Sequence, residues 1–230
     1  MNDLQVILTE EMALPSVADA LPKDFNKARF IQNTMALFNE KPELLEFPRE
    51  KLIPGVLKAA YLGLDFMMGE CYLIPYGNQI KFSIDYKGKI KLAKKYSVKP
   101  ISEIEAHLIR EGDEYKVEMR DNQNYITYIP KPLNDGEIRG AFAICRFKDG
   151  TIIYEEMTKR QLDTAKRLSK AQTGIPWKMF DDMMYKKTVI NRLFNRITLD
   201  NDAYHNILMD DKIIDDNPPE IIQEEENPFT

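Results

Sequence analysis

The feature that most limits the possible folds is the segment CYLIPYGNQIKFSIDYKG, residues 71–88. It is rich in aromatic and β-branched residues, which favour strands, and Gly77-Asn78 at its centre is typical of a two-residue hairpin turn. Side chains along the second strand alternate, with Ile80, Phe82, Ile84 and Tyr86 on one face and Lys81, Ser83, Asp85 and Lys87 on the other. The pattern predicts an antiparallel hairpin that ends at Gly88, followed by a short basic helix with the sequence KIKLAKKY.

Strands and helices are also predicted in the rest of the chain. The strands lie at about 101–110, 114–119, 124–129, 137–147 and 151–156, and EGDE, PKPLNDG and KDG between them have the composition of turns. Helices are predicted at 24–40, at 56–64, from the capping-box residue Thr158 to about 171, and from Trp177 to about 199. Because no strand–helix–strand alternation runs through the middle, we expect an α+β fold with an antiparallel β-sheet and hairpin packed by helices at both ends.

The length and composition predict one domain and a tail. With 230 residues, 43% of them hydrophobic, the chain is long enough for one substantial core, which we place in residues 1–199 with N-terminal helices. The acidic, Pro-containing segment 200–230 is expected to be disordered. No run of 18 apolar residues is present and the first residues lack the pattern of a signal peptide, so a cytoplasmic protein without a membrane segment is expected. Cys71 and Cys145 stand alone in the sequence, which favours buried, reduced thiols.

The net charge of −5 conceals two basic segments. Residues 81–99 hold seven lysines and a single acid, Asp85, and residues 159–196 hold ten basic residues against three acids. Residues 200–226 hold ten acids against Lys212 alone. Charge distribution matters more for nucleic-acid binding than the sum, so the two basic segments remain compatible with a nucleic-acid partner.

Most groups used in enzyme catalysis are absent from the sequence. His107 and His205 are the only histidines, so a catalytic histidine pair or a zinc site is not expected. The sequence also lacks GxxxxGK[ST], GxGxxG and GxSxG, the motifs of nucleotide binding and of serine hydrolases. Three carboxylates, Asp65, Glu70 and Asp85, leave open a magnesium-dependent nuclease, although isolated acids of this kind are more often surface residues or helix caps.

The last predicted helix has two lysines in its apolar stripe. At 100° per residue, one side of the helix collects Phe180, Met183, Met184, Ile190, Leu193, Phe194 and Ile197. Lys186 and Lys187 fall within this stripe, whereas Arg192 and Arg196 lie opposite. Either the lysines extend along apolar neighbours and place their ammonium groups in water, or the stripe lines a groove in which they meet an anion.

Aromatic residues interleave with both basic segments: Tyr72, Tyr76, Phe82, Tyr86, Tyr96 and Trp177. Lysines that follow a phosphate backbone and rings that support bases are typical of proteins that bind single-stranded nucleic acids. The alternative is that the rings belong to the core and the lysines to a solvated surface.

Three motifs, in this order, resemble the RecT family of phage single-strand annealing recombinases, over roughly residues 55–197. They are GLDFMMGECYLIPYG, then FSIDYKGKIKLAKK, then WKMFDDMMYKKTVINRLF. The matching residues are Gly63, Leu64, Tyr72, Pro75, Tyr76, Tyr86, Lys87, Gly88, Ile90, Leu92, Ala93, Trp177, Lys178, Lys186, Lys187, Thr188 and Arg192. The resemblance implies an annealing-protein core of the β-β-β-α type.

The resemblance also implies a function. Members of the family bind single-stranded DNA without sequence preference, form rings and helical filaments, and pair complementary strands without ATP. The DNA-binding residues expected here are Tyr72, Tyr76, Lys81, Tyr86, Lys87, Lys89, Lys91, Lys178, Lys186, Lys187, Thr188 and Arg192. The stripe of the last helix would then line a groove partly closed by the hairpin, and Asp85 would repel phosphate if it faced that groove.

The expected partners are single-stranded DNA, the annealed duplex and further copies of the chain as a homo-oligomer. A phage exonuclease that makes single-stranded ends and a host single-stranded-DNA-binding protein are further candidates. No cofactor is expected, and the sequence leaves open whether magnesium assists annealing. A magnesium-dependent nuclease and a general RNA and DNA chaperone remain the alternatives.

The end of the chain, EEENPF before Thr230, resembles the acidic Pro-Phe tip of bacterial single-stranded-DNA-binding proteins. Two roles of the tail remain open. Its carboxylates could occupy the basic groove in place of phosphates, or its tip could dock on a replication or exonuclease partner.

Overall fold

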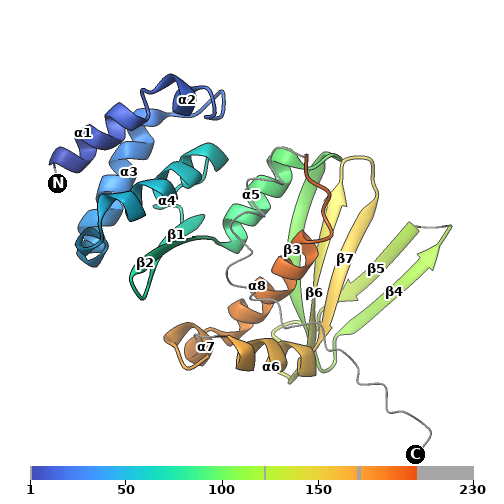
Figure 1. Ribbon diagram of the computed structural model, residues 1–230. Helices are drawn as coiled ribbons and strands as arrows, with labels where there is room; N and C mark the ends of the chain where they lie inside the picture. The colour runs from blue at the N-terminus through green and yellow to red at the C-terminus, as the bar shows by residue number, and fades with distance from the viewer. Residues whose placement is uncertain (1, 122, 170–171, 201–230) are drawn as a thin grey trace, which may run out of the picture. The chain divides into compact units, whose positions relative to one another are not determined.

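The computed structural model describes residues 2–121, 123–169 and 172–200, which form two compact units (Figure 1). The described part of the first unit is 2–98 with 199 and 200, and that of the second is 99–198 without 122, 170 and 171. Helices and small antiparallel sheets confirm the α+β class. The tail beyond Asp200 lies outside the described residues, so its expected disorder and its two roles stay predictions, as does the single domain at 1–199.

The first unit is built from helices and one hairpin (Figure 1). Its elements are α1 (Asn2–Glu11), α2 (Pro15–Ala18), α3 (Lys27–Glu40), the 3-10 helix η1 (Pro42–Glu46), α4 (Arg49–Leu62), β1 (Cys71–Tyr76), β2 (Gln79–Ile84) and α5 (Tyr86–Tyr96). Helix α3 confirms the helix predicted at 24–40, whereas α4 begins seven residues before the predicted 56–64. Helix α4 packs so closely on β1 that a Cβ at Gly55 would lie 2.7 Å from Leu73 Cδ2.

The hairpin β1–β2 forms as predicted around Gly77-Asn78, with Leu73 opposite Phe82 and Ile74 opposite Lys81. Leu73, Phe82 and Cys71 are buried on its inner side. Cys145 in the second unit is buried too, which confirms the expectation for both thiols, and burial raises the pKa of Cys71 well above its ordinary value.

The strand β2 ends at Ile84, so the prediction that it continues to Gly88 is wrong. Asp85 is the N-cap of α5, with its side chain 5% exposed, and its Oδ1 accepts a hydrogen bond from Lys87 N at 3.3 Å. Gly88 lies in the first turn of α5, where an added Cβ would stand 2.2 Å from the carbonyl oxygen of Glu70. Glycine is therefore required by a close backbone approach and does not mark the end of a strand.

Gly88→Ala is expected to destabilise the first unit. Alanine favours a helix by about 1 kcal/mol over glycine, but the contact with Glu70 forces the backbone to move, so we expect a net loss of about 1–3 kcal/mol. Chemical denaturation measures this loss, with Lys94→Ala on an exposed position of the same helix as the control. Equal stability of the two variants would show that α5 does not approach Glu70 this closely.

In its described residues, the second unit contains five strands in two sheets. They are β3 (Ile101–Arg110), β4 (Glu114–Arg120), β5 (Gln123–Ile129), β6 (Ile138–Phe147) and β7 (Ile152–Thr158), close to the predicted positions. The larger sheet has the order β3-β6-β7 with antiparallel pairing, and β4–β5 is a separate hairpin. Residues 140–145 of the central strand are all buried, as expected for a strand covered on both faces.

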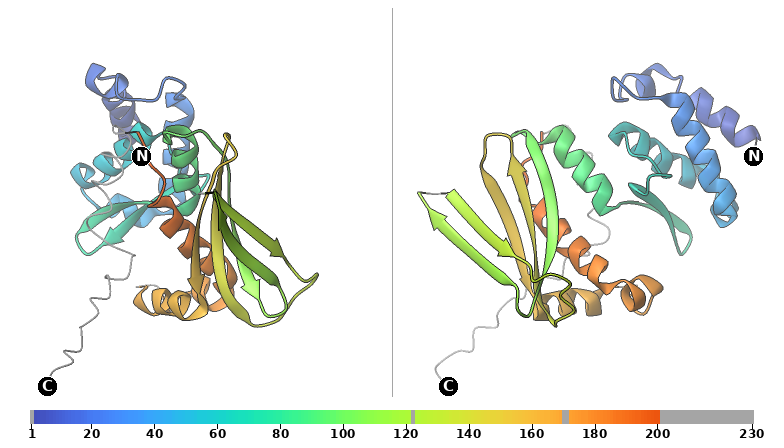
Figure 2. Two further views of the ribbon diagram at one scale, coloured as in Figure 1. Left: turned by 90° about the vertical axis from the view of Figure 1, so that its right-hand side faces the viewer. Right: turned by 180° about the vertical axis from the view of Figure 1, so that it is seen from behind.

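The hairpin β4–β5 and the helices of the second unit lie on opposite faces of the larger sheet, as Figures 1 and 2 show. Rings join the hairpin to the sheet: Phe142 lies 4.9 Å from Tyr115 and 5.1 Å from Tyr128 between ring centroids. His107 stacks on Phe142 at 5.3 Å, so this histidine belongs to a packed aromatic cluster.

Three helices follow the sheet: α6 (Lys159–Leu168), α7 (Ile175–Met179) and α8 (Asp181–Phe194). The capping box of Thr158 and Gln161 is confirmed. Helix α6 ends at Leu168, and the predicted extension to 171 reaches residues outside the described part. The prediction of one helix from Trp177 to about 199 is wrong. The helical conformation is interrupted at Phe180, between α7 and α8, and α8 ends at Phe194. None of the helices in the described ranges has the length and apolar character needed to cross a membrane.

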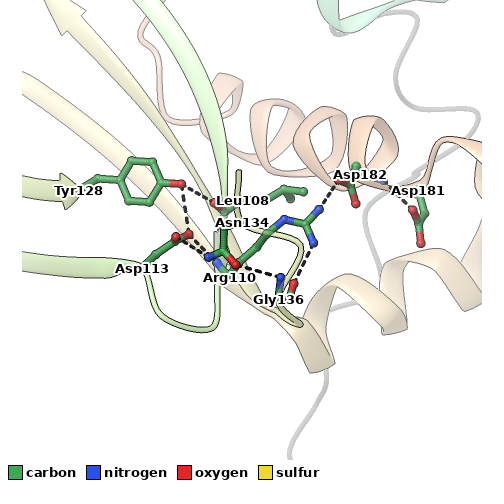
Figure 3. Close-up of polar contacts among 8 residues, drawn as sticks. All are labelled: Leu108, Arg110, Asp113, Tyr128, Asn134, Gly136, Asp181 and Asp182. Atoms are coloured by element: carbon green, nitrogen blue, oxygen red, sulfur yellow. Dashed lines mark hydrogen bonds and ion pairs between the residues drawn. The ribbon is translucent and has the colours of Figure 1, made fainter. Parts of the chain in front are cut away.

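A polar network holds the loops at one end of this sheet (Figure 3). The Asp113 carboxylate accepts hydrogen bonds from Arg110 N at 2.8 Å, Lys131 N at 2.9 Å and Asn134 Nδ2 at 2.7 Å. Arg110 in turn donates to the carbonyl oxygen of Gly136 at 2.9 Å and pairs with Asp182 at the start of α8. The network therefore links β3, the loop before β6 and helix α8.

The pH dependence of stability tests the Asp113 contacts. Burial of the carboxyl acts to raise the pKa of Asp113, but hydrogen bonds, led by those from the Arg110 and Lys131 N–H groups, lower it overall. Because the pKa is lowered on folding, its contribution is present above the ordinary value of about 3.9 and is lost as the pH falls through the folded value.

Asp113→Asn should thus reduce the free energy of unfolding at pH 7, and the difference from wild type should shrink as the pH falls below about 4. Denaturation curves at both pH values measure it, and Asp135→Asn, at an exposed carboxyl of the loop before β6, is the control. A difference that does not change with pH contradicts the assignment.

Candidate nucleic-acid interface

The predicted DNA-binding residues divide between the two units. Those of the first unit are Tyr72, Tyr76, Lys81, Tyr86, Lys87, Lys89 and Lys91. Those of the second are Lys178, Lys186, Lys187, Thr188 and Arg192. Each set is described by itself, and the groove expected between the hairpin and the last helix stays a prediction.

The outer face of the hairpin β1–β2 brings aromatic and basic side chains together. Opposite Ser83, Lys81 and Gln79 stand Tyr72, Ile74 and Tyr76, so strand alternation places these side chains on the face away from Leu73 and Phe82. Tyr76 is 58% exposed and Ile74 44%. The hairpin thus presents rings, an apolar side chain and a lysine on one surface.

Two lysines of the preceding segment, Lys41 between α3 and η1 and Lys51 in α4, add positive charge next to this hairpin. Lys41 Nζ lies 5.9 Å from the centroid of the Tyr72 ring, and Lys51 Nζ lies 2.9 Å from Asn78 Oδ1 at the turn. Burial, with a smaller effect of the Asp85 charge, raises the pKa of Tyr72. Sequence reasoning missed Lys41 and Lys51, because isolated lysines in or beside packing helices carry no motif.

The lysines of α5 differ in their surroundings. Lys87 is exposed, whereas Lys89 and Tyr86 are half-buried. Lys91 Nζ lies 2.7 Å from Glu70 Oε2, an oxygen that also accepts a hydrogen bond from Asp65 N at 2.8 Å. The charge of Lys91 is therefore partly balanced within the fold. The buried carboxylate of Asp85 caps the helix, which removes the expected source of repulsion on the hairpin surface.

The three carboxylates of the nuclease alternative have structural partners. Asp65 accepts from Asn33 Nδ2 at 2.7 Å and from Met67 N at 2.8 Å, Glu70 pairs with Lys91, and Asp85 is the helix cap. Within residues 2–121, 123–169 and 172–200, no group of three or more His, Cys, Asp or Glu side chains is placed to hold a metal ion.

Trp177 of α7 is a core residue. Its ring is 3% exposed, lies 5.6 Å from the Tyr185 ring between centroids, and donates from Nε1 to Ser169 Oγ at 3.2 Å. Lys166 Nζ lies 5.6 Å from the same ring. Trp177 therefore packs the short α7 against α8, and its buried ring is not presented to a ligand.

Helix α8 buries part of the predicted stripe, namely Ile190, Leu193 and Phe194, and the predicted Ile197 just after the helix is buried as well. Its buried residues are Tyr185, Val189, Ile190, Leu193 and Phe194, and it packs on β6, β3 and β7. Phe180 and Met183, assigned to the core stripe from the sequence, are exposed. Lys186, three residues after Met183, is exposed as well. Lys186 therefore does not lie in the core, and Lys187 is half-buried.

Two other motif residues have contacts inside the second unit. Thr188 Oγ1 donates to the carbonyl oxygen of Met184 at 2.8 Å, a bond within the helix. Arg192 lies 2.9 Å from Glu155 Oε1 on β7, and Arg196 lies 3.3 Å from the other oxygen of the same carboxylate. The arginine contacts fasten α8 and the residues just after it to the sheet, and a role in DNA binding for Thr188 or Arg192 stays a prediction.

The comparison with known proteins gives the class of this molecule. Residues 28–227 match the RecT family, so the match covers both basic segments and the hairpin. The chain belongs to the RecT family, the single-strand annealing proteins of DNA recombination, which confirms the resemblance found in its motifs.

Two relatives show how far the similarity extends. The chain is 28% identical over 221 residues to Protein RecT of Escherichia coli (strain K12), which covers 92% of this chain and 81% of that protein. It is also 28% identical over 191 residues to the uncharacterized protein YqaK of Bacillus subtilis (strain 168). That match covers 80% of this chain and 65% of YqaK, slightly under two thirds of its length.

The variants Lys186→Ala and Arg192→Ala test whether each side chain binds DNA or stabilises the fold. Because Lys186 is exposed, its removal should change the free energy of unfolding by less than about 0.5 kcal/mol while weakening the binding of single-stranded DNA. Arg192→Ala should cost about 1 kcal/mol, since it leaves Glu155 with fewer hydrogen bonds. Thermal denaturation and fluorescence anisotropy with a labelled oligonucleotide measure the two effects. A destabilised Lys186→Ala with unchanged DNA affinity would assign Lys186 to the fold.

Proposed function

We propose that this protein binds single-stranded DNA without sequence preference and anneals complementary strands without ATP. The observation that carries the proposal is the RecT-family match over residues 28–227, which includes the hairpin surface of Tyr76 and Lys81 and the exposed lysines 178 and 186. These side chains have the two properties that a single-stranded ligand requires: positive charge for its phosphates and flat or apolar surface for its bases.

The mechanism is electrostatic and geometric. Lysine ammonium groups neutralise the phosphates of one strand, and the released counterions drive binding. Contacts to phosphate position the strand but carry no sequence information, so the base edges stay available to a second strand. Watson–Crick pairing then selects the complementary strand. No step in this sequence forms or breaks a covalent bond, so a non-enzymatic protein without a nucleotide cofactor suffices.

Assembly and partners follow from the same class. We infer that copies of the chain form a ring or helical filament, in which the binding surfaces of neighbouring copies hold one strand in register. The proposed partners are an exonuclease that supplies single-stranded ends and a host single-stranded-DNA-binding protein. The proposed location is the host cytoplasm. The support for the proposed assembly, partners and location is the membership of the chain in the RecT family.

A strand-annealing assay tests the proposed function directly. Two complementary oligonucleotides, one of them labelled, should form duplex faster with the protein than without it, in EDTA and without nucleotide. Binding to single-stranded DNA should weaken as salt rises, with a slope of about 0.7 in log affinity against log salt for each phosphate neutralised. The affinity should vary little among oligonucleotides of equal length and different sequence.

Three results would contradict the proposal. Acceleration only with ATP indicates a motor or switch, shortened strands in magnesium indicate a nuclease, and equal annealing of RNA and DNA with higher affinity for RNA indicates a general chaperone. A flat salt response excludes the electrostatic mechanism.

A further inference from the structure

An exposed apolar patch lies where helix α7 meets helix α8. It consists of Ile175, Met179, Phe180 and Met183, which are 68%, 72%, 52% and 60% exposed. Single exposed apolar residues are common and need no explanation. Here four exposed apolar residues lie within nine consecutive residues, and packing within the second unit does not explain why they are apolar.

The patch lies on the sides of the two helices that do not form the core. In α7, Trp177 is buried, while Ile175 and Met179, four positions apart, share another side. In α8, Tyr185, Val189 and Leu193 are buried against the sheet. Met183 and Lys186, three positions apart, lie on a side that stays exposed.

Phe180 is held at the junction by its backbone. It lies outside both helices with φ −136° and ψ 39°, and its N–H donates to the carbonyl oxygen of Pro176 at 3.0 Å. The buried Trp177 and the buried Tyr185 fix the two helices on either side of it. The backbone of Phe180 is therefore fixed, and its side chain is presented to solvent.

Two exposed lysines flank the patch, Lys178 and Lys186 on either side of Phe180. Of the two acids in this segment, Asp182 pairs with Arg110 (Figure 3). Asp181 Oδ1 accepts a hydrogen bond from Asp182 N at 2.9 Å, a contact that does not neutralise its charge. A ligand that fits must combine an apolar, flat surface with negative charge, and a single-stranded nucleic acid has both.

We propose that Phe180 contacts a base of the bound single strand, with Met179 and Met183 beside it and Lys178 and Lys186 at the flanking phosphates. The inference rests on the proposed function and adds to it a base-contacting residue that the aromatic pattern of the sequence did not select. Methionine side chains adapt to rings of different shape, and stacking does not depend on base identity, so the contact agrees with binding that is independent of sequence.

The experiment compares Phe180→Ala with wild type on two ligands of equal length and charge: an oligothymidylate and an abasic strand that has the phosphates but lacks the bases. Loss of the stacking contact should weaken oligothymidylate binding by about 5-fold or more and leave abasic-strand binding within about 2-fold, a difference below 0.5 kcal/mol. Phe180→Trp, which keeps an aromatic surface, should restore the affinity. Tyr125→Ala, at a ring of β5 with 48% exposure in the same unit, is the matched control.

Two further measurements keep the inference separable from the proposed function. The fluorescence of the new tryptophan in Phe180→Trp should be quenched by oligothymidylate more strongly than that of the buried Trp177 in wild type. Sedimentation without DNA should show the same assembly state for Phe180→Ala and wild type, and thermal denaturation the same stability.

If Phe180→Ala binds both strands as wild type does, or loses affinity for both equally, Phe180 does not contact a base and this inference fails while the proposed function stands. A changed assembly state without DNA would instead assign the patch to contacts between copies of the chain. If wild type binds neither strand, the proposed function fails first and the inference with it.

Discussion

The close approach of helix α5 to the carbonyl oxygen of Glu70 determines the directions of the lysines in the first basic segment. Only glycine at position 88 leaves room for that oxygen, and the buried Asp85 caps the helix that begins there. The chain consequently changes from strand to helix at residue 85. Lys81 stays on the outer face of the hairpin, while Lys87 and Lys91 follow the helical period. Lysines that alternate in the sequence are thus distributed over two kinds of surface.

Periodicity predicted the strands well and the helix boundaries less well. The turn of the hairpin β1–β2 and the strands β3 to β7 lie within about two residues of their predicted positions, because alternation and turn residues are local signals. The start of α5 was missed since Ser83, Ile84 and Asp85 continue the alternation, and the boundary is set by a contact with Glu70 that no local pattern records. The break at Phe180 was missed for the same reason, because its apolar side chain fits a continuous helix.

The candidate site was predicted in part. Tyr72, Tyr76 and Lys81 do share the outer face of the hairpin, since strand alternation determines it. An apolar stripe on a helix shows which side can be buried but not how much of it a neighbouring element covers. In α8 the sheet covers the turns of Val189 and Leu193, while Phe180 and Met183 remain exposed. Motif residues such as Trp177 and Arg192 could not be assigned from sequence, because a ligand contact and an internal contact require the same side chain.

The internal ion pairs limit how much of the positive charge can act on DNA. Lys91 and Arg192 already face Glu70 and Glu155, carboxylates that are only 15% and 14% exposed. A phosphate that took either cation would leave a poorly hydrated carboxylate next to another anion, which is unfavourable. Exposed lysines such as 87, 178 and 186 carry no such cost. If the proposed function holds, the number of phosphates neutralised should therefore be smaller than the number of basic residues in the two segments.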